Sequence, residues 1–283
     1  MRCDFFNDAG GFLEVATPFL AENEAENTVV LGIALRCRRA PRSDAVMAVV
    51  RDGAAVRMVA VMTPPHALVL STGDADVIPC LIEGLDAAAI RPPGVSGVEP
   101  LAERFAAVWT SRGRAVARPE SRLKLYRASS IAAPPDVPGE LRPAVDGDLE
   151  WLAAWQVRFA EQAGLSAAER AADMRTVVAA RLARGEMVVW AIDGRPVSSA
   201  AFVPTTPAGD AGRINAVFTL EQERGKGYAS ACVAALSRQL LDRGWRYCLI
   251  FADRGNPITT RIYPRLGYRE IATFSRIAFR HDS

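Results

Sequence analysis

A strand, a glycine-rich turn and a helix follow one another in residues 213–235, RINAVFTLEQERGKGYASACVAA. The apolar run at 214–220 predicts a buried strand, and apolar residues recur at helical spacing from Tyr228 onward. The helix is expected to stop at Asp242-Arg243-Gly244. This stretch predicts an α/β fold in which a strand leads through a tight turn into a helix N-terminus.

The turn carries Arg224, Gly225, Lys226 and Gly227. A helix N-terminus presents unpaired backbone N–H groups and the positive end of the helix dipole, so a polyphosphate can bind there. The two glycines have no Cβ to hold an anion away from those groups, and the two basic residues add positive charge. The same pattern also occurs as an ordinary strand-to-helix turn, and a P-loop is disfavoured because the Gly-Lys-Ser/Thr ending is missing.

Further motifs follow a second predicted strand at 246–253. They are Asn256, then Tyr263 seven residues later, then Gly267-Tyr268. In order and spacing, these residues together with Gln222-x-x-Gly225-x-Gly227 resemble the GNAT superfamily of acyl-coenzyme A-dependent N-acetyltransferases over residues 140–280. The resemblance implies an α/β fold with a central mixed, twisted sheet and helices on both of its faces.

The resemblance also implies a site for acetyl-coenzyme A as co-substrate. In the family the central strand binds the pantetheine amides, because an open strand edge can pair with an extended chain of amides. The implied coenzyme-binding residues are Val217, Phe218, Thr219, Arg224, Gly225, Lys226, Gly227, Tyr228, Ala229, Ser230, Asn256 and Tyr263. Asn256 equally fits an ordinary helix cap. Phe218 stands where tyrosine is frequent in relatives, which leaves an acetyl or a longer acyl donor open.

Three side chains are candidates for catalysis: Tyr263, Glu161 and Asp253. By resemblance Tyr263 is the general acid, and a phenol with a pKa near 10 stays protonated at neutral pH and can donate to a departing thiolate. A tyrosine on an apolar helical face is also a common core residue. Glu161 and Asp253 are alternative general bases, and each is equally well a solvated surface carboxylate. A backbone N–H near Phe218 or Thr219 is the implied oxyanion donor.

The acceptor side of the site is expected on two helices before the central strand. These are predicted at 149–164 and 167–184, the second with Ser166 and Glu169 as a capping box. Trp155, Phe159 and Glu161 are candidates for contact with the amine substrate. Aromatic residues at helical spacing are also typical of a core, so this reading stays open beside the functional one.

A proline-rich stretch divides the chain. Residues 132–139 hold three prolines and a glycine and cannot form a helix or a central strand, so we expect a linker there and an acetyltransferase domain at 140–283. Residues 1–131 are expected to be a degenerate copy of the same fold or an unrelated α/β domain, with a strand at 28–36 and an acidic segment at 71–76 in place of the glycine turn. As a degenerate copy, this half would form one side of the acceptor pocket or provide the contact surface of a dimer.

Composition disfavours several classes of protein. No apolar run is long enough to span a membrane, and residues 1–11 carry acidic residues where a signal peptide needs a basic stretch followed by an apolar one. A cytoplasmic protein without membrane contact is therefore expected. The 34 basic and 32 acidic residues are mixed along the chain, which disfavours nucleic acid as a partner. Five widely spaced cysteines and only two histidines make a disulfide framework or a metal site unexpected.

These patterns together predict an N-acetyltransferase that moves an acetyl group directly from acetyl-coenzyme A to a primary amine of a small-molecule acceptor. The protein is expected to be a monomer or a homodimer. The alternative is a non-catalytic sensor or interaction protein that keeps the coenzyme site. The retained Tyr263 favours the enzyme over the sensor.

Overall fold

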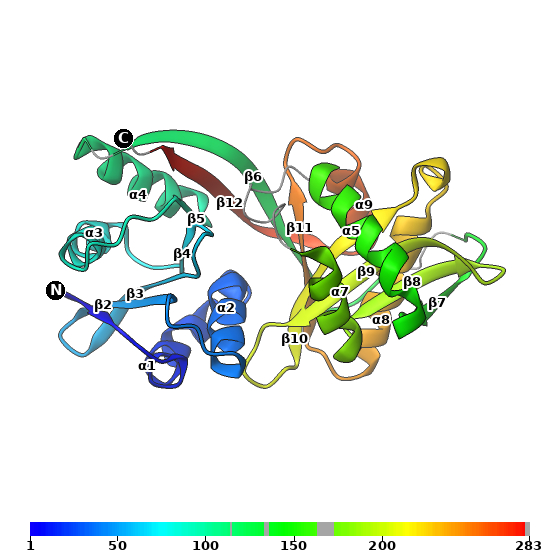
Figure 1. Cartoon of the computed structure of the whole chain (residues 1–283), viewed down its shortest axis with the longest axis horizontal. Coiled ribbons are helices and arrows are strands. Elements are labelled where there is room, and N and C mark those ends of the chain that lie inside the picture. The colour runs from blue at the N-terminus through cyan, green and yellow to red at the C-terminus, as the bar shows by residue number, and fades with distance from the viewer. Residues whose placement is uncertain (114, 133–135, 163–172, 281–283) are drawn as a thin grey trace.

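The computed structural model describes residues 1–113, 115–132, 136–162 and 173–280, which form one mixed sheet of twelve strands covered by helices (Figure 1). The N-terminal half contains β1 (Arg2–Phe5), α1 (Ala9–Glu22), α2 (Thr28–Arg39), β2 (Val46–Asp52), β3 (Ala55–Met62), β4 (Leu68–Leu70), α3 (Ile78–Ala87), β5 (Gly94–Val98), α4 (Glu99–Ser111) and β6 (Val116–Ala128). The C-terminal half contains β7 (Glu140–Pro143), α5 (Leu149–Gln162), α7 (Met174–Ala183), β8 (Met187–Ile192), β9 (Arg195–Pro204), β10 (Ala211–Thr219), α8 (Tyr228–Asp242), β11 (Tyr247–Asp253), α9 (Thr259–Arg265) and β12 (Arg269–Arg280). In both halves the described elements follow the same order, so the N-terminal half repeats the topology of the C-terminal half.

The two halves exchange their last strands. The sheet order is β1-β2-β3-β4-β5-β12-β6-β11-β10-β9-β8-β7, so β12 pairs with β5 of the other half and β6 pairs with β11. Figure 1 shows β6 and β12 side by side between the halves, where they also pair with each other. The pairs β4–β5 and β10–β11 are parallel, and the other neighbours are antiparallel. The linker predicted at 132–139 lies between β6 and β7, while the sheet itself continues across both halves.

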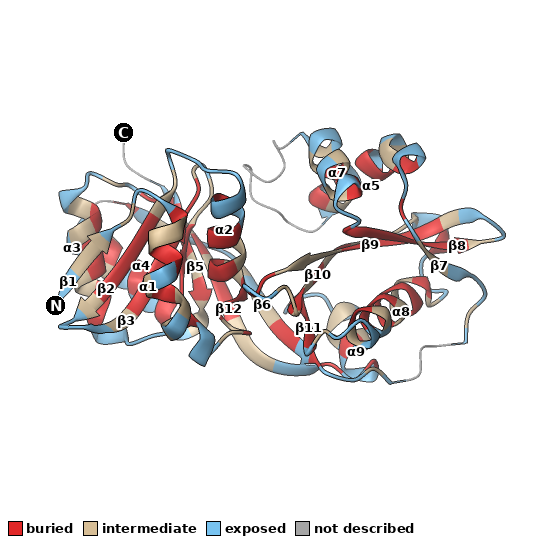
Figure 2. Cartoon of the chain, turned by 90° about the horizontal axis from the view of Figure 1, so that it is seen from below, coloured by how far each residue is buried: buried red, intermediate tan, exposed pale blue. Residues whose placement is uncertain are grey.

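Helices cover both faces of each half, as the resemblance implied (Figure 2). In the N-terminal half, α1 and α2 bury their apolar sides against one face of the sheet, and α3 and α4 bury theirs against the other. In the C-terminal half, α5 and α7 cover one face, and α8 and α9 cover the opposite face. We refer to the side under α5 and α7 as the α5/α7 face.

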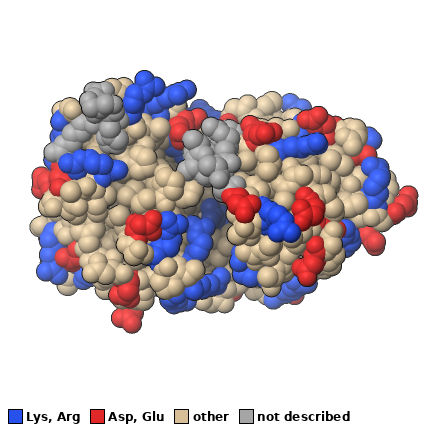
Figure 3. All heavy atoms as spheres, viewed as in Figure 1, with Lys and Arg blue, Asp and Glu red and all other residues tan. Residues whose placement is uncertain are grey.

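Polar contacts also join the halves beside the exchanged strands. The buried hydroxyl Oγ1 of Thr28 on α2 donates to Oγ1 of Thr205 at 2.7 Å, and Arg246 pairs with Glu24 at 2.7 Å. Figure 3 shows acidic and basic side chains interspersed over one side of the molecule, with a hollow between the halves. Within the described ranges, every helix is too short or too polar to cross a bilayer.

The strand predicted at 28–36 is wrong, because these residues belong to α2. The buried residues Val30, Leu31, Ala34 and Leu35 recur at helical rather than alternating spacing. Packing of that apolar side against α1 and the sheet therefore outweighs the strand preference of the β-branched residues. The capping box predicted at Ser166 and Glu169 lies outside the described residues.

Candidate active site

The central strand β10 separates from β11 halfway along its length. The parallel register runs from Ala211↔Tyr247 to Ile214↔Ile250 and then ends, although β10 continues to Thr219 and β11 to Asp253. The backbone of residues 215–219 on the β11 side is therefore open. The structure thus has the open strand edge that binding of an extended amide chain requires.

A β-bulge lies at the start of this opening. The register between β10 and β9 jumps from Asn215↔Ala201 to Phe218↔Ser199, so Ala216 and Val217 face a single residue of β9. Ala216 has a positive φ of 51°, which is uncommon for a residue with a Cβ. A bulge bends its strand and increases the local twist, so it accounts for the divergence of β10 from β11.

The glycine loop, residues 224–227, follows this opening and leads into α8. Gly227 caps the helix with φ 88° and Gly225 has φ 78°, both in the left-handed region that glycine adopts without strain. A Cβ added at Gly225 would have no heavy atom within 4 Å, so the space beside it is open. The first N–H groups of α8, from Tyr228 to Ser230, have no partner inside the helix and can bind an anion.

Hydrogen bonds hold both basic side chains of this loop in place. The buried carboxylate of Glu223 accepts hydrogen bonds from Lys226 Nζ at 2.9 Å and from Arg195 Nη1 at 2.8 Å. The bond from Lys226, followed by that from Arg195, lowers the pKa of Glu223. Arg224 donates to Gln162 Oε1 at 2.6 Å and to the carbonyl oxygen of Thr219 at 3.3 Å, which ties the end of α5 to the end of β10. The loop is therefore held by the ion pair of Lys226 with Glu223 and by the neutral partners of Arg224.

Tyr263 on α9 is almost completely buried, with 5 % of its surface exposed. The centroid of its ring lies 6.0 Å from the ring centroids of both Tyr126 and Tyr268. The buried apolar cluster that contains Tyr263 also includes Tyr228, the first residue of α8, and Ala252, near the end of β11. Burial raises the pKa of the Tyr263 phenol above its ordinary value near 10. The phenol is therefore protonated at neutral pH, as a proton donor must be.

The turn between β11 and α9 is held by two polar side chains that the sequence singled out. Asn256 Oδ1 accepts from the backbone N–H groups of Ile258 at 3.0 Å and Thr259 at 3.4 Å, which matches the helix-cap alternative. Asp253 Oδ1 accepts from the N–H of Gly255 at 2.6 Å. Both side chains are exposed; Asp253 is the last residue of β11, and Asn256 follows three residues later.

The three acceptor-side candidates on α5 have different environments. Trp155 is 7 % exposed and packs on Phe218 and Trp151, with ring centroids 5.5 and 4.7 Å away, so it belongs to the core beneath α5. Phe159 is half-buried at the margin of that core, and Glu161 is exposed. Trp155 therefore supports the position of Phe218, while Phe159 and Glu161 retain access to solvent.

Several buried polar groups on the α5/α7 face escaped the sequence reading. Gln156 Nε2, Ser199 Oγ and Asn215 Oδ1 are buried and have no hydrogen-bond partner among the described residues. Register pairs Ser199 with Val189 and Asn215 with Ala201, both of which belong to the core beneath α5. Buried polar atoms without a protein partner are typical of sites that hold water or a ligand. The sequence feature that could have revealed these groups is a polar residue at a core-facing position of an otherwise apolar strand.

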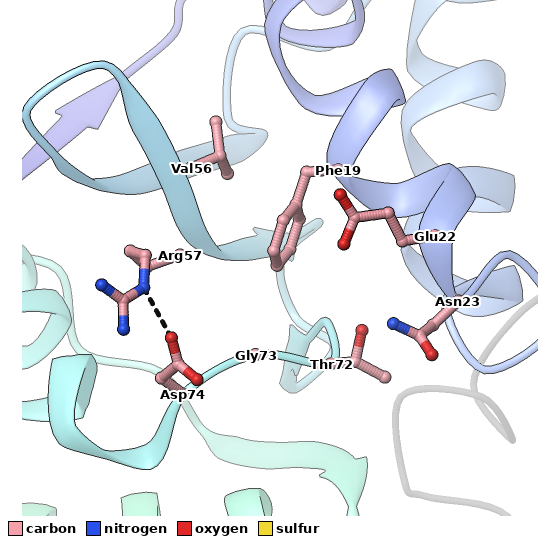
Figure 4. Close-up of a pocket in the computed structure, with 8 residues that line it drawn as sticks. All are labelled: Phe19, Glu22, Asn23, Val56, Arg57, Thr72, Gly73 and Asp74. Atoms are coloured by element: carbon pink, nitrogen blue, oxygen red, sulfur yellow. Dashed lines mark hydrogen bonds and ion pairs between the residues drawn. The ribbon is translucent and has the colours of Figure 1, made fainter.

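The N-terminal half has a corresponding loop after β4, which Figure 4 shows at close range. Arg57 Nε pairs with Asp74 Oδ2 at 2.6 Å, in the same topological place as the Arg195–Glu223 pair. The glycine loop is replaced by a 3₁₀ turn, Ala75–Val77, that contains Asp76. The hollow in Figure 4 is lined by Glu22 and Asp74 among others, so an anion finds no free basic group there.

The opening between strands is also missing from the described N-terminal half. A Cβ at Gly97 of β5 would lie 3.2 Å from Cβ of Leu70, the last residue of β4, so these two strands remain in contact to the end of β4. The parallel pairs Leu68↔Val95 and Val69↔Ser96 precede that contact. The acidic segment 71–76 thus follows a closed strand pair.

Comparisons with known proteins agree with this geometry. Residues 150–268 match the model of the acetyltransferase (GNAT) family. A Drosophila protein solved by a structural genomics consortium has a TM-score of 0.67 at 12 % identity, with 99 % of each chain covered. A GNAT-family acetyltransferase from Colwellia psychrerythraea has a TM-score of 0.57 at 11 % identity, with 100 % of each chain covered.

A tandem GNAT protein from the clavulanic acid biosynthesis pathway has a TM-score of 0.55 at 12 % identity, again with 100 % of each chain covered. At these identities the likeness concerns the fold alone. A search among curated proteins gives no match. The chain has a tandem GNAT fold, and its residues 150–268 match the model of the acetyltransferase (GNAT) family.

Proposed function

We propose that the protein is an N-acetyltransferase that moves the acetyl group of acetyl-coenzyme A directly to a primary amine of a small-molecule acceptor. The observation that carries the proposal is the opening between β10 and β11, which lies directly before the glycine loop and the N-terminus of α8. An extended amide chain fits the open backbone of residues 217–219, and a diphosphate fits the N–H groups from Gly225 to Ser230. One ligand that contains both groups is coenzyme A.

Direct transfer needs a neutral amine, a donor for the carbonyl oxygen and a proton for the thiolate. The amine nitrogen attacks the thioester carbonyl carbon, the backbone N–H near Phe218 or Thr219 stabilises the oxyanion, and the carbon–sulfur bond then breaks. The O–H of Tyr263 gives its proton to the departing sulfur. Glu161 or Asp253, both exposed, would take the proton of the amine through water.

A calorimetric titration with acetyl-coenzyme A tests the coenzyme site. We expect binding by the wild type and its loss in Gly225→Glu, because the new side chain brings bulk and negative charge into the open space beside the loop. Gly244→Glu is the matched control, since Gly244 also has a positive φ and open surroundings but lies at the opposite end of α8. No binding by the wild type, or equal loss in both variants, would contradict the proposal.

Tyr263→Phe separates the enzyme from the non-catalytic sensor. The substitution removes one hydroxyl from a packed ring, so the fold and coenzyme binding are expected to stay intact while thiol release with a panel of primary amines falls strongly. The release of coenzyme A thiol is followed by a colorimetric reagent. Binding of acetyl-coenzyme A by the wild type without any amine-dependent thiol release would favour the sensor, and an unchanged rate in Tyr263→Phe would remove this residue from the mechanism.

A further inference from the structure

Arg213 extends from the central strand toward the other half of the protein. It is the third residue of β10, and its register partner Val203 places it on the α5/α7 face together with Asn215. Its Nη2 atom lies 3.6 Å from the position that a Cβ at Gly32 of α2 would occupy. The guanidinium of Arg213 therefore sits at the junction of the halves, against α2.

Among the described residues, none accepts a hydrogen bond from the buried Nε atom of this guanidinium. Arg213 Nε is buried and makes no hydrogen bond. Asn215 Oδ1, two residues further along the same face, is buried and unpartnered as well. A buried N–H donor without a partner is unfavourable, since buried polar groups are normally hydrogen-bonded. The Nε–H of Arg213 is therefore a donor that an anion can complete, whereas Asn215 Oδ1 is an acceptor that fits a donor such as an amine or a water molecule.

Two further arginines surround this position. Arg36 lies one turn after Gly32 on α2, and Arg181 lies on α7. Burial, followed by the positive charges of Arg36 and Arg181, lowers the pKa of Arg213 to about 10. The nearby carboxylate of Glu186 is already paired with Arg184 at 2.8 Å. Figure 3 shows basic side chains at the hollow between the halves.

The position of Arg213 relative to the acyl site limits the size of the ligand. From Arg213 to the bulge at Val217 the strand advances four residues, or about 13 Å at about 3.3 Å per residue. An acceptor that reaches from the acyl site to Arg213 is therefore an extended small molecule of about this length, with its amine and its anionic group at opposite ends.

We infer that the acceptor amine also carries an anionic group, a carboxylate or a phosphate, and that Arg213, with Arg36 and Arg181, binds this group at the junction of the two halves. The inference rests on the proposed function for the identity of the ligand as an acceptor. The anion site itself is defined by the arginines alone. The N-terminal half then contributes to acceptor binding through Arg36.

Anion binding can be measured without any transfer reaction. Thermal unfolding of Gly225→Glu, in which the glycine loop is blocked, is followed with inorganic phosphate and with chloride at equal ionic strength. We expect phosphate to raise the midpoint, and Arg213→Gln in this background to weaken phosphate binding at least tenfold. Arg36→Gln, an exposed position, gives a second variant that leaves the buried packing unchanged. Arg175→Gln, an exposed arginine of the same helix as Arg181, is the matched control and should bind phosphate normally.

The acceptor assay distinguishes carboxylate from phosphate. Dipeptides are compared with their C-terminal amides, and glucosamine 6-phosphate with glucosamine, by release of coenzyme A thiol. We expect the wild type to transfer faster to the charged member of at least one pair. In Arg213→Gln, the KM for that charged acceptor should rise, while the KM for its neutral counterpart should stay the same.

Each outcome decides one of the two claims. The anion site would be overturned if phosphate raised the unfolding midpoint equally in Gly225→Glu with and without Arg213→Gln. It would also be overturned if phosphate raised neither midpoint. Phosphate binding that depends on Arg213, together with no transfer to any amine, would retain the anion site and refute the acetyltransferase. Transfer at equal rates to charged and neutral members, unaffected by Arg213→Gln, would retain the enzyme and refute the anionic acceptor.

Discussion

The exchange of β6 and β12 predicts that the two halves unfold as one cooperative unit. Leu125 on β6 is fully buried and packs in a cluster with Leu249 of β11 and Phe274 of β12. Leu125→Ala removes this packing from both halves at once, and a large-to-small core substitution of this kind costs about 3 kcal/mol of unfolding free energy. For a chain of this size, a urea m-value of about 3 kcal/mol/M converts that cost into a midpoint shift of about 1 M.

Two spectroscopic probes test the single transition. Four of the five tryptophans lie in the C-terminal half, so fluorescence reports mainly on that half, whereas far-UV circular dichroism reports on both. We expect both probes to give one midpoint in the wild type and one lower midpoint in Leu125→Ala. Leu81→Ala, a fully buried position on α3 in the N-terminal half, should also lower the midpoint seen by fluorescence.

Separate halves would give a different result. If each half unfolded alone, fluorescence and circular dichroism would have different midpoints, and Leu81→Ala would shift only the circular dichroism signal of its own half. That outcome would refute the argument that strand exchange couples the halves. It would also support the 132–139 boundary as a boundary between independent folding units.

Two further substitutions probe the glycine loop and the central strand. Glu223→Gln is expected to destabilise the fold at neutral pH. Because folding lowers the pKa of Glu223, its carboxylate stabilises the fold above about pH 4.5. The difference in unfolding free energy between the variant and the wild type should therefore close as the pH falls below this value. Urea unfolding at pH 7 and at pH 3 measures the effect, and an equal difference at both pH values would contradict it. Gly212→Ala places a Cβ 2.1 Å from the carbonyl oxygen of Val203, so we expect a loss of at least about 1–3 kcal/mol, whereas Gly147→Ala, in open space, should unfold like the wild type.

The elements of the C-terminal half could be predicted from local sequence because their patterns are local. The strand predicted at 214–220 is β10, the strand predicted at 246–253 is β11, and the helix predicted to begin at Tyr228 is α8. Hydrophobic period and glycine position determine such elements over a few residues. The error at α2 arose because β-branched residues at its start favour a strand locally, while tertiary packing decides the outcome.

The features that make the site were not readable from the sequence in the same way. The exchange of β6 and β12 depends on pairing between residues more than a hundred positions apart, and the bulge at Ala216 depends on the register between β10 and β9. Arg213 looks like a surface residue to any local hydropathy reading. Its Nη2 atom lies against α2, which belongs to the other half of the chain, and such a long-range contact has no local sequence signal.

Comparison of the two halves separates the contacts that hold the glycine loop in place from the groups that we propose bind phosphate. The pairs Arg57–Asp74 and Arg195–Glu223 occur at the same topological position, so this ion pair positions the loop in both halves. Only the C-terminal loop, among the described residues, adds two glycines of positive φ beside strands that diverge. In the N-terminal half the strands stay in contact at Gly97, and the 3₁₀ turn Ala75–Val77 leads directly into α3. Because the ion pair is present in both halves, we expect phosphate binding to require the open backbone N–H groups of the C-terminal loop.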